Sequence, residues 1–244
     1  MKRLMALVVL ASLVFWKPAL AESSSPLDQS RTWLVRAMKS WVPLSDHKIH
    51  NETEQEAEAR YDSIASDALH VAFEPGEKPL FDGPYGRQRT SLLIVTIARY
   101  ESNFIRRIDE GRCLKGECDN GAAACIMQVH TEDGLILEPD TYSYAHSKSK
   151  EWLDSHSEKV LTKDSLKDRK TCFRAALHKM RESLSGCRSV PKSEDRLGIY
   201  TGEGCNSTRP NPKSRTRIGL ANYYFASKVP PVTDSSVLGA FFVN

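Results

Sequence analysis

The sequence predicts an α-rich (α+β) fold, made mostly of helices with at most a small sheet. Apolar residues recur at helical spacing in several segments, which indicates helices with one buried face. Stretches rich in glycine, proline and polar residues separate these segments and predict loops. No internal repeat or low-complexity tract is present, so we expect helices connected by loops in one well-packed domain with an extension.

The first 21 residues have the layout of a secretory signal peptide. Lys2 and Arg3 precede an apolar stretch from Leu4 to Phe15 and the small-residue site Ala19-Leu20-Ala21. The apolar stretch is shorter than the ~20 residues that a membrane-spanning helix needs. We therefore expect cleavage after Ala21, a periplasmic or secreted protein, and no stable membrane insertion once the signal is removed.

The mature chain is formally neutral. Three of the 34 basic residues lie in the signal segment, so 31 basic residues remain against 31 acidic ones. A nucleic-acid binder normally carries a net positive face or tail. The local basic group of Arg209, Lys213, Arg215 and Arg217 fits a solvated surface or a cleft edge. We expect no nucleic-acid partner.

Residues 22–85 are expected to form an N-terminal helical extension and linker. Two helices are predicted from the spacing of apolar residues, the first over residues 28–41 and the second over residues 51–73. Asn51 and Glu54 have the pattern of a capping box at the start of the second helix. The prolines and glycines that follow predict a linker or ordered loop.

Residues 86–230 are expected to form the main domain, followed by a C-terminal tail over residues 231–244. The first helix, over about residues 90–104, contains the apolar run 92–97, whose isoleucine, valine and threonine content also suits a strand. We favour a helix because the run continues into Ala98 without a turn signal. Further helices are expected over residues 172–181, 196–200 and 215–226, a short extended piece over 126–129, and short helices or a lid within 131–168.

Six cysteines follow the signal segment, an even set in an oxidising compartment. Of the fifteen possible connectivities, loop length and the helix pattern favour the pairs Cys113–Cys118, Cys125–Cys172 and Cys187–Cys205. A zinc site is the rival interpretation, but no Cys-x-x-Cys pair is present and the histidines lie elsewhere. The His47-x-x-His50 pair is expected at the surface, and no metal is expected.

The most informative motif is Arg99-Tyr100-Glu101-Ser102-Asn103-Phe104, which closes the apolar run from Leu92 to Ala98. We expect a carboxyl group at that place to lie where the core meets a cleft, and partial desolvation there disfavours its charged form. Such a group can stay protonated near neutral pH and donate a proton, which glycoside cleavage requires. Glu101 is therefore the candidate catalytic acid.

Glu101-Ser102 is the first of four segments that follow one another in a recognisable order. The others are Ala122 to Gln128, the helix from Asp168 to Leu177, and Leu197-Gly198-Ile199-Tyr200-Thr201-Gly202. Together they resemble the soluble lytic transglycosylase family of the lysozyme-like superfamily, with its goose-type lysozyme relatives, over roughly residues 86–227. The second segment is similar to the family's G-A-x-G-L-M-Q and the fourth to its A-Y-N-x-G. Ala122 and Cys125 replace the two glycines, and Thr201 replaces the asparagine.

The resemblance implies a lysozyme-like domain that cleaves peptidoglycan, with Glu101 as its single acid and base. Ser102, Met127, Gln128 and Tyr200 would be the substrate-binding residues. The bond cleaved would be the β-1,4 bond between N-acetylmuramic acid and N-acetylglucosamine, and the product would carry a 1,6-anhydro ring. The implied partner is a peptidoglycan glycan strand, with no cofactor, and we expect a monomer.

Two alternatives stay open at this point. A hydrolytic muramidase would need a second carboxylate. Asp119 is the candidate, because it precedes the glutamine motif much as an acidic loop does in goose-type lysozymes, and Asp109 is another. A non-catalytic wall-binding or assembly protein would keep the fold without the chemistry. Ser102 would either cap the helix end or hold the Glu101 carboxyl.

Overall fold

The computed structural model describes residues 24–131, 134–138, 141–185 and 212–242. This part of the chain is mostly helical with two small antiparallel sheets, which confirms the predicted α-rich (α+β) class. The predicted signal peptide lies outside the described residues. The helices and strands are α1 (Pro26–Trp41), α2 (Glu54–Phe73), α3 (Gly86–Ser102), α4 (Arg106–Asp109), β1 (Ala123–Ala124), β2 (Val129–His130), β3 (Leu135–Glu138), β4 (Thr141–Tyr144), α5 (Lys150–Ser155), α6 (Arg169–Ser185), α7 (Pro212–Ser227) and α8 (Asp234–Phe242).

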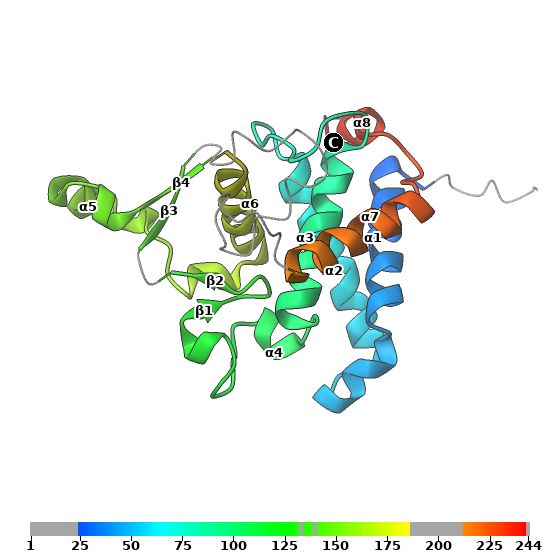
Figure 1. Ribbon diagram of the computed structural model, residues 1–244, viewed down its shortest axis with the longest axis horizontal. Helices are drawn as coiled ribbons and strands as arrows, with labels where there is room; N and C mark the ends of the chain where they lie inside the picture. Colours follow the sequence, from blue (N-terminus) through cyan, green and yellow to red (C-terminus); the bar gives the residue numbers. More distant parts are fainter. Residues whose placement is uncertain (1–23, 132–133, 139–140, 186–211, 243–244) are drawn as a thin grey trace, which may run out of the picture.

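The helices form the body of the molecule, and one hairpin projects from it. Helices α1, α2 and α3 pack side by side, α6 packs on α2, and α7 crosses α3. Strands β3 and β4 extend away from α6 and carry α5 at their far end (Figure 1). None of the helices in the described part is long and apolar enough to cross a membrane.

Helix α2 begins with a capping box, although one that differs from the prediction. The Thr53 hydroxyl accepts a hydrogen bond from the Glu56 amide (3.2 Å), and the Glu56 carboxylate accepts one from the Thr53 amide (2.9 Å). The predicted pair of Asn51 and Glu54 was wrong by two residues. Asn51 instead has a left-handed backbone (φ 57°) and ends the preceding 3₁₀-helix η1 (Leu44–His50).

His47 in that 3₁₀-helix is buried, so its predicted surface position was wrong. Its side chain is 2% exposed, and its Nε2 lies 2.7 Å from the Tyr61 hydroxyl on α2. The Tyr61 hydroxyl in turn donates to the Val42 carbonyl (3.0 Å). The spacing of two histidines carries no information about this contact, because its partner lies on another helix.

Residues 92–97 are helical, as favoured, and lie within α3. The helix starts at Gly86, earlier than predicted, because its first amides have a distant partner. The Asp234 carboxylate accepts hydrogen bonds from the amides of Arg87 (2.7 Å) and Gln88 (3.2 Å). A carboxylate at this position satisfies two donors that have no partner inside the helix.

The predicted C-terminal tail was wrong in part, because most of it forms α8. Asp234 starts this helix, and Val237 on it is fully buried against the main core. Helix α8 contacts α1 and α3. The predictions for residues 172–181 and 215–226 are confirmed by α6 and α7, which extend beyond them. The helix predicted at 196–200 lies outside the described residues.

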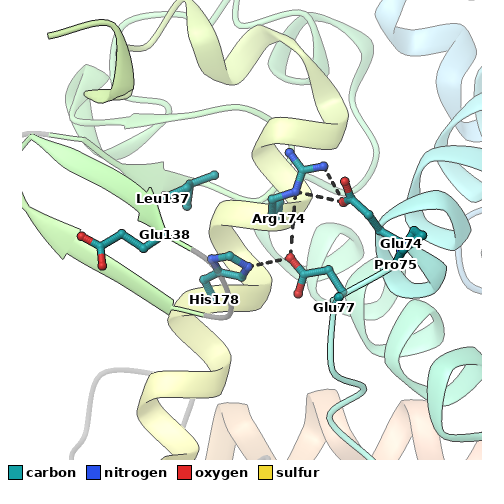
Figure 2. Close-up of a pocket in the computed structure, with 8 residues that line it drawn as sticks. Glu74, Pro75, Glu77, Leu137, Glu138, Arg174 and His178 are labelled. Carbon is teal, nitrogen blue, oxygen red and sulfur yellow. Dashed lines mark hydrogen bonds and ion pairs between the residues drawn. The ribbon is translucent and has the colours of Figure 1, made fainter. Parts of the chain in front are cut away.

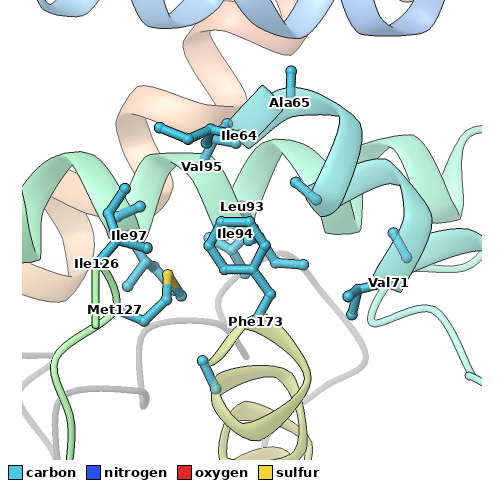
Figure 3. Close-up of a cluster of buried hydrophobic side chains, with 14 of the residues drawn as sticks. Ile64, Ala65, Val71, Leu93, Ile94, Val95, Ile97, Ile126, Met127 and Phe173 are labelled. Carbon is cyan, nitrogen blue, oxygen red and sulfur yellow. The ribbon is translucent and has the colours of Figure 1, made fainter. Parts of the chain in front are cut away.

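A single buried cluster joins the N-terminal helices to the rest of the molecule. Figure 3 shows side chains of α2, α3 and α6 meeting in it, among them Ile64, Ile94 and Phe173, which are all 0% exposed. Leu34 of α1 belongs to the same cluster. The helices assigned to an N-terminal extension therefore contribute to the core that positions α3.

Two hairpins make up the sheets in the described part of the chain. Ala123 and Ala124 pair with His130 and Val129, so the predicted extended piece at 126–129 was wrong except for its last residue. Residues 125–128 form the turn. The second hairpin pairs β3 with β4 in the region where short helices were predicted. Those helices are present too, as α5 and the 3₁₀-helices Ala145–Ser147, Ser157–Lys159 and Ser165–Lys167.

Candidate active site

Glu101 lies in the last turn of α3, half-buried. Asn103 (φ 51°) and Phe104 (φ 54°) then turn the chain sharply. The Phe104 side chain is 0% exposed and its ring meets the Tyr61 ring edge-on, with centroids 5.2 Å apart. Because Phe104 anchors the chain in the core directly after the helix, the backbone that carries Glu101 is held on both sides.

Ser102, next to Glu101, is bonded to its own helix. Its side chain is 4% exposed and its hydroxyl donates to the Ala98 carbonyl at 2.7 Å. This is the local pattern of serine in a helix. The Ser102 hydroxyl therefore makes a contact at the helix end, which is the first of its two expected roles.

The turn of the β1–β2 hairpin packs on the face of α3 that carries Glu101. Figure 3 shows Ile126 and Met127 beside Ile97, and all three belong to the main buried cluster. Ile97 and Glu101 are four residues apart and so lie on the same side of the helix. Met127 is 1% exposed, so it packs in the core below the turn.

The chain between α3 and the end of β2, residues 103–130, is called the site segment below. Seven of the eight non-glycine residues with positive φ in the described part of the chain lie in it. They are Asn103, Phe104, Cys118, Asp119, Asn120, Cys125 and Gln128. Such backbone conformations cost about 1–3 kcal/mol each, persist only where surrounding structure fixes them, and cluster at functional sites.

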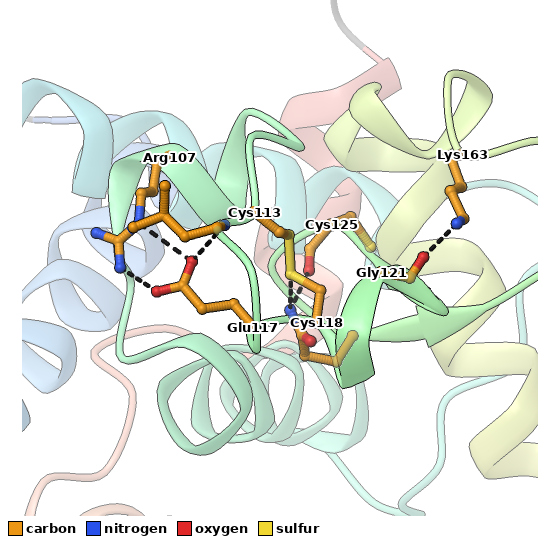
Figure 4. The surroundings of a disulfide bond; sticks show 9 residues. Arg107, Cys113, Glu117, Cys118, Gly121, Cys125 and Lys163 are labelled. Atoms are coloured by element: carbon orange, nitrogen blue, oxygen red, sulfur yellow. Dashed lines mark hydrogen bonds and ion pairs between the residues drawn. A yellow bond between two sulfur atoms is a disulfide. The ribbon is translucent and has the colours of Figure 1, made fainter.

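Two disulfides fix the site segment, and both were predicted. Cys113 is bonded to Cys118, five residues away, and Cys125 to Cys172 on α6, 47 residues away. Figure 4 shows the first bond beside the Arg107–Glu117 ion pair. Cys187 and Cys205 lie outside the described residues.

Gln128 ends the hairpin turn, and its side chain folds back over the turn. Its backbone is left-handed (φ 52°). Its side-chain amide nitrogen donates to the Cys125 carbonyl (3.1 Å) and to the Cys118 sulfur (3.3 Å). The side chain is half-buried. The amide group is therefore fixed by both disulfide-bonded loops.

The two candidate second carboxylates already have partners. Asp119 is exposed, and its Oδ2 lies 2.7 Å from His130 Nε2 across the hairpin. Asp109 is 5% exposed and accepts two hydrogen bonds from the Arg169 guanidinium, at 2.9 and 2.7 Å. Arg169 also bonds Asp67 on α2 (2.6 Å). Asp109 thus belongs to an ion-pair network that ties α4 to α6 and α2.

A cavity of about 280 Å³ lies at another place, between α6, the loop after α2 and the β3–β4 hairpin (Figure 2). In it, Glu77 Oε1 lies 2.7 Å from His178 Nε2, and Glu77 Oε2 accepts a hydrogen bond from Arg181 (2.8 Å). Burial alone would raise the pKa of Glu77, but the bonds from His178 and Arg181 outweigh it and lower that pKa. Among the candidate site residues that the structure describes, none lines this cavity.

Sequence reasoning missed this buried cluster and the Arg169 network, because their partners are separated by 60 residues or more. Tyr200, the remaining predicted substrate contact, lies outside the described residues. Within the described part, no group of three or more histidine, cysteine, aspartate or glutamate side chains is arranged to hold a metal ion. Comparison with family models, with curated proteins and with solved structures found no match.

Proposed function

We propose that this protein is a lytic transglycosylase that cleaves the β-1,4 bond between N-acetylmuramic acid and N-acetylglucosamine in peptidoglycan. The observation that carries the proposal is the left-handed backbone of Cys125 (φ 62°). The matching position in the family's G-A-x-G-L-M-Q motif is glycine, the residue that adopts this conformation without steric cost. At this position the hairpin turn thus has a backbone conformation that suits the glycine of the motif, although the residue in this chain is cysteine.

The disulfide accounts for the change from glycine to Cys125. A non-glycine residue in this conformation costs about 1–2 kcal/mol. A cross-link that closes a loop of tens of residues stabilises by about 2–4 kcal/mol, which offsets that cost. The bond from Cys125 to Cys172 joins the hairpin to α6, so the same residue that departs from the motif also fixes the turn.

The half-buried place of Glu101 suits a group that must donate and then accept a proton. In the proposed reaction, the Glu101 carboxyl protonates the glycosidic oxygen as its bond to C1 of N-acetylmuramic acid breaks. The carbonyl oxygen of that sugar's N-acetyl group stabilises the cationic C1. The Glu101 carboxylate then takes the proton of the 6-hydroxyl, whose oxygen bonds to C1. Glu101 is restored and no water is consumed.

The single-acid reaction is favoured over hydrolysis because of the partners of the other carboxylates. Asp109 is buried against Arg169, and removing it from that pair would leave a buried charge without compensation. Asp119 lies against His130. The muramidase and the non-catalytic wall-binding protein remain the outcomes that the test below separates from the proposal.

The test digests purified peptidoglycan with the mature protein in water enriched in ¹⁸O, followed by mass spectrometry of the fragments. A lytic transglycosylase gives 1,6-anhydro ends without ¹⁸O. A hydrolase gives reducing ends that each contain one ¹⁸O atom. Absence of any cleavage would favour the wall-binding alternative, and either of the last two results overturns the proposal.

Glu101→Gln tests the assigned acid. We expect the rate to fall about 10³-fold or more, because the residue serves as acid and then as base. Glu110→Gln is the matched control, since Glu110 lies nine positions later in an exposed pair with Arg106 and Arg112. An unchanged rate for Glu101→Gln would remove Glu101 from the mechanism.

Two disulfides in the described part fit an oxidising compartment. We propose that the protein acts in the periplasm or after secretion, on peptidoglycan glycan strands and as a monomer. A size measurement of the purified mature protein in solution checks the last point.

A further inference from the structure

The Gln128 side chain is held by a sulfur atom as well as by the backbone. Its amide nitrogen lies 3.3 Å from Cys118 Sγ and 3.1 Å from the Cys125 carbonyl. Within the described part of the chain, these are its side-chain hydrogen bonds. Sulfur is a weak hydrogen-bond acceptor. The Cys118 sulfur therefore orients the Gln128 amide only if the sulfur itself is held in place.

Cys118 is in turn fixed by its surroundings. It is 5% exposed, has a left-handed backbone (φ 51°), and packs with Ile108 and Ala123 in a small buried cluster. Its carbonyl accepts hydrogen bonds from the amides of Gly121 (2.8 Å) and Ala123 (2.9 Å). The backbone of Cys118 therefore starts the turn that leads into β1.

The disulfide to Cys113 fixes the rotation of the Cys118 side chain. The loop between the two cysteines is itself anchored by Glu117, which pairs with Arg107 on the α4 side and accepts a hydrogen bond from the Leu114 amide (2.8 Å). The bonds from Arg107 and Leu114 lower the pKa of Glu117, which keeps it charged in this pair. Figure 4 shows this chain of contacts from Arg107 to the disulfide.

We propose that Cys118, held by its disulfide to Cys113, is a positioning residue for Gln128, and that the candidate site is fully active only while this disulfide is oxidised. The inference rests on the proposed function, in which Gln128 contacts the glycan. A dithiol reductant would supply two electrons. The S–S bond would break, each sulfur would take a proton, and the Cys118 side chain could then rotate away from Gln128.

The test is a mutant cycle of Cys113→Ser with Cys118→Ser, Gln128→Ala, and the combination of all three. Kinetics are measured on soluble, uncrosslinked glycan strands. We expect the double serine variant to lose about tenfold to a hundredfold in kcat, the effect of a small misplacement, with KM changed much less. If the disulfide acts through Gln128, the triple variant should be no slower than Gln128→Ala alone.

Leu114→Ala is the matched control, because Leu114 lies within the same disulfide loop and is 60% exposed. It should leave kcat unchanged. Additive losses in the cycle, or a double serine variant as active as the parent protein, would overturn the inference. A melting curve for each variant checks that the assay temperature is below unfolding.

A second measurement keeps this inference separate from the proposed function. The side-chain amide signals of Gln128 are assigned by NMR through their absence in Gln128→Ala. We expect them at shifted, ordered positions in the parent protein and displaced toward random-coil positions in the double serine variant, which keeps only the Cys125 carbonyl contact. If the parent protein cleaves no glycan, the proposed function fails and these signals alone decide whether the disulfide orders Gln128; unchanged signals overturn that.

Discussion

The helical core and the site segment are held together in different ways. In α2, α3 and α6 regular backbone hydrogen bonds and buried apolar side chains act together. In residues 103–130 the regular elements are one short α-helix, the 3₁₀-helix Asp119–Gly121 and two two-residue strands, and seven non-glycine residues have left-handed backbone. Two disulfides and the Arg169 ion pairs fix this part. The strained backbone of the site segment thus depends on cross-links, whereas the helical core depends on packing.

The largest effect is expected from a cavity in the core at a residue outside the site segment. Leu34→Ala on α1 removes a fully buried side chain and should cost about 3 to 5 kcal/mol of unfolding free energy. Chemical denaturation measures the loss. The activity of the folded fraction should be unchanged, and a change in the product pattern would mean that core and site segment are not separable. Ile49→Ala, at an 80% exposed position, is the control.

Replacing Cys125 and Cys172 by serine tests how far the site segment depends on its cross-links. The loop that this disulfide closes spans 47 residues, against five for Cys113–Cys118. Loop entropy then predicts losses of about 4 and about 2 kcal/mol for the two serine pairs. We expect the Cys125–Cys172 variant to lose activity as well, because the turn loses its tie to α6. Equal melting temperatures for the two variants would contradict the loop-entropy account.

His47 makes part of the core sensitive to pH. Burial, with the nearby Arg60 charge, lowers the pKa of His47 below its ordinary value near 6.5. Its Nε2 donates to Tyr61, because the Tyr61 hydroxyl proton is used on Val42. Its Nδ1 lies 3.6 Å from the Glu52 carboxylate.

The direction in which stability changes with pH follows from the protons that the folded and unfolded chains bind. Below about pH 6.5 the unfolded chain binds a proton at His47 that the folded protein does not, so stability falls as the pH falls, by up to about 1.4 kcal/mol per pH unit. His47→Gln should remove this slope between pH 7 and 5, while the exposed His146→Gln should retain it. Urea denaturation at several pH values measures both, and an unchanged slope in His47→Gln would assign it to other groups.

The smallest effect is expected at the start of α2. Thr53→Ala removes the hydroxyl that accepts the Glu56 amide and should cost about 1 kcal/mol. Ser149→Ala removes the corresponding cap of the short helix α5. Thermal melting compares the two. A larger loss of stability for Ser149→Ala than for Thr53→Ala would mean that the six-residue helix α5 contributes more to the fold than the start of α2 does.

The sequence was most informative where one local pattern determines the structure. The apolar spacing predicted α1, α2, α6 and α7, and the place of Glu101 at the end of a buried helix. Loop length and helix pattern predicted two disulfides, because a close pair and a helix-borne cysteine restrict the connectivity. Two-residue strands have no such pattern, which is why the β1–β2 hairpin was misplaced.

Contacts between distant residues could not be predicted in this way. The burial of His47 depends on Tyr61, and the partner of Asp109 is Arg169, 60 residues later. At the site, the motif indicated Gln128 but not the contact of its amide with Cys118. That contact depends on backbone angles of residues that rarely adopt them, and tertiary packing rather than residue type sets those angles.

The bonds from Asp234 to the start of α3 also bear on the order in which the protein can fold. The chain is synthesised from its N-terminus, and the Arg87 and Gln88 amides precede their carboxylate partner by 147 and 146 residues. The Asp234 amide then bonds the Pro84 carbonyl at 2.8 Å, so the contact is made from both sides. Helix α3, whose last turn carries Glu101, therefore cannot gain these two bonds at its start until residue 234 has been synthesised.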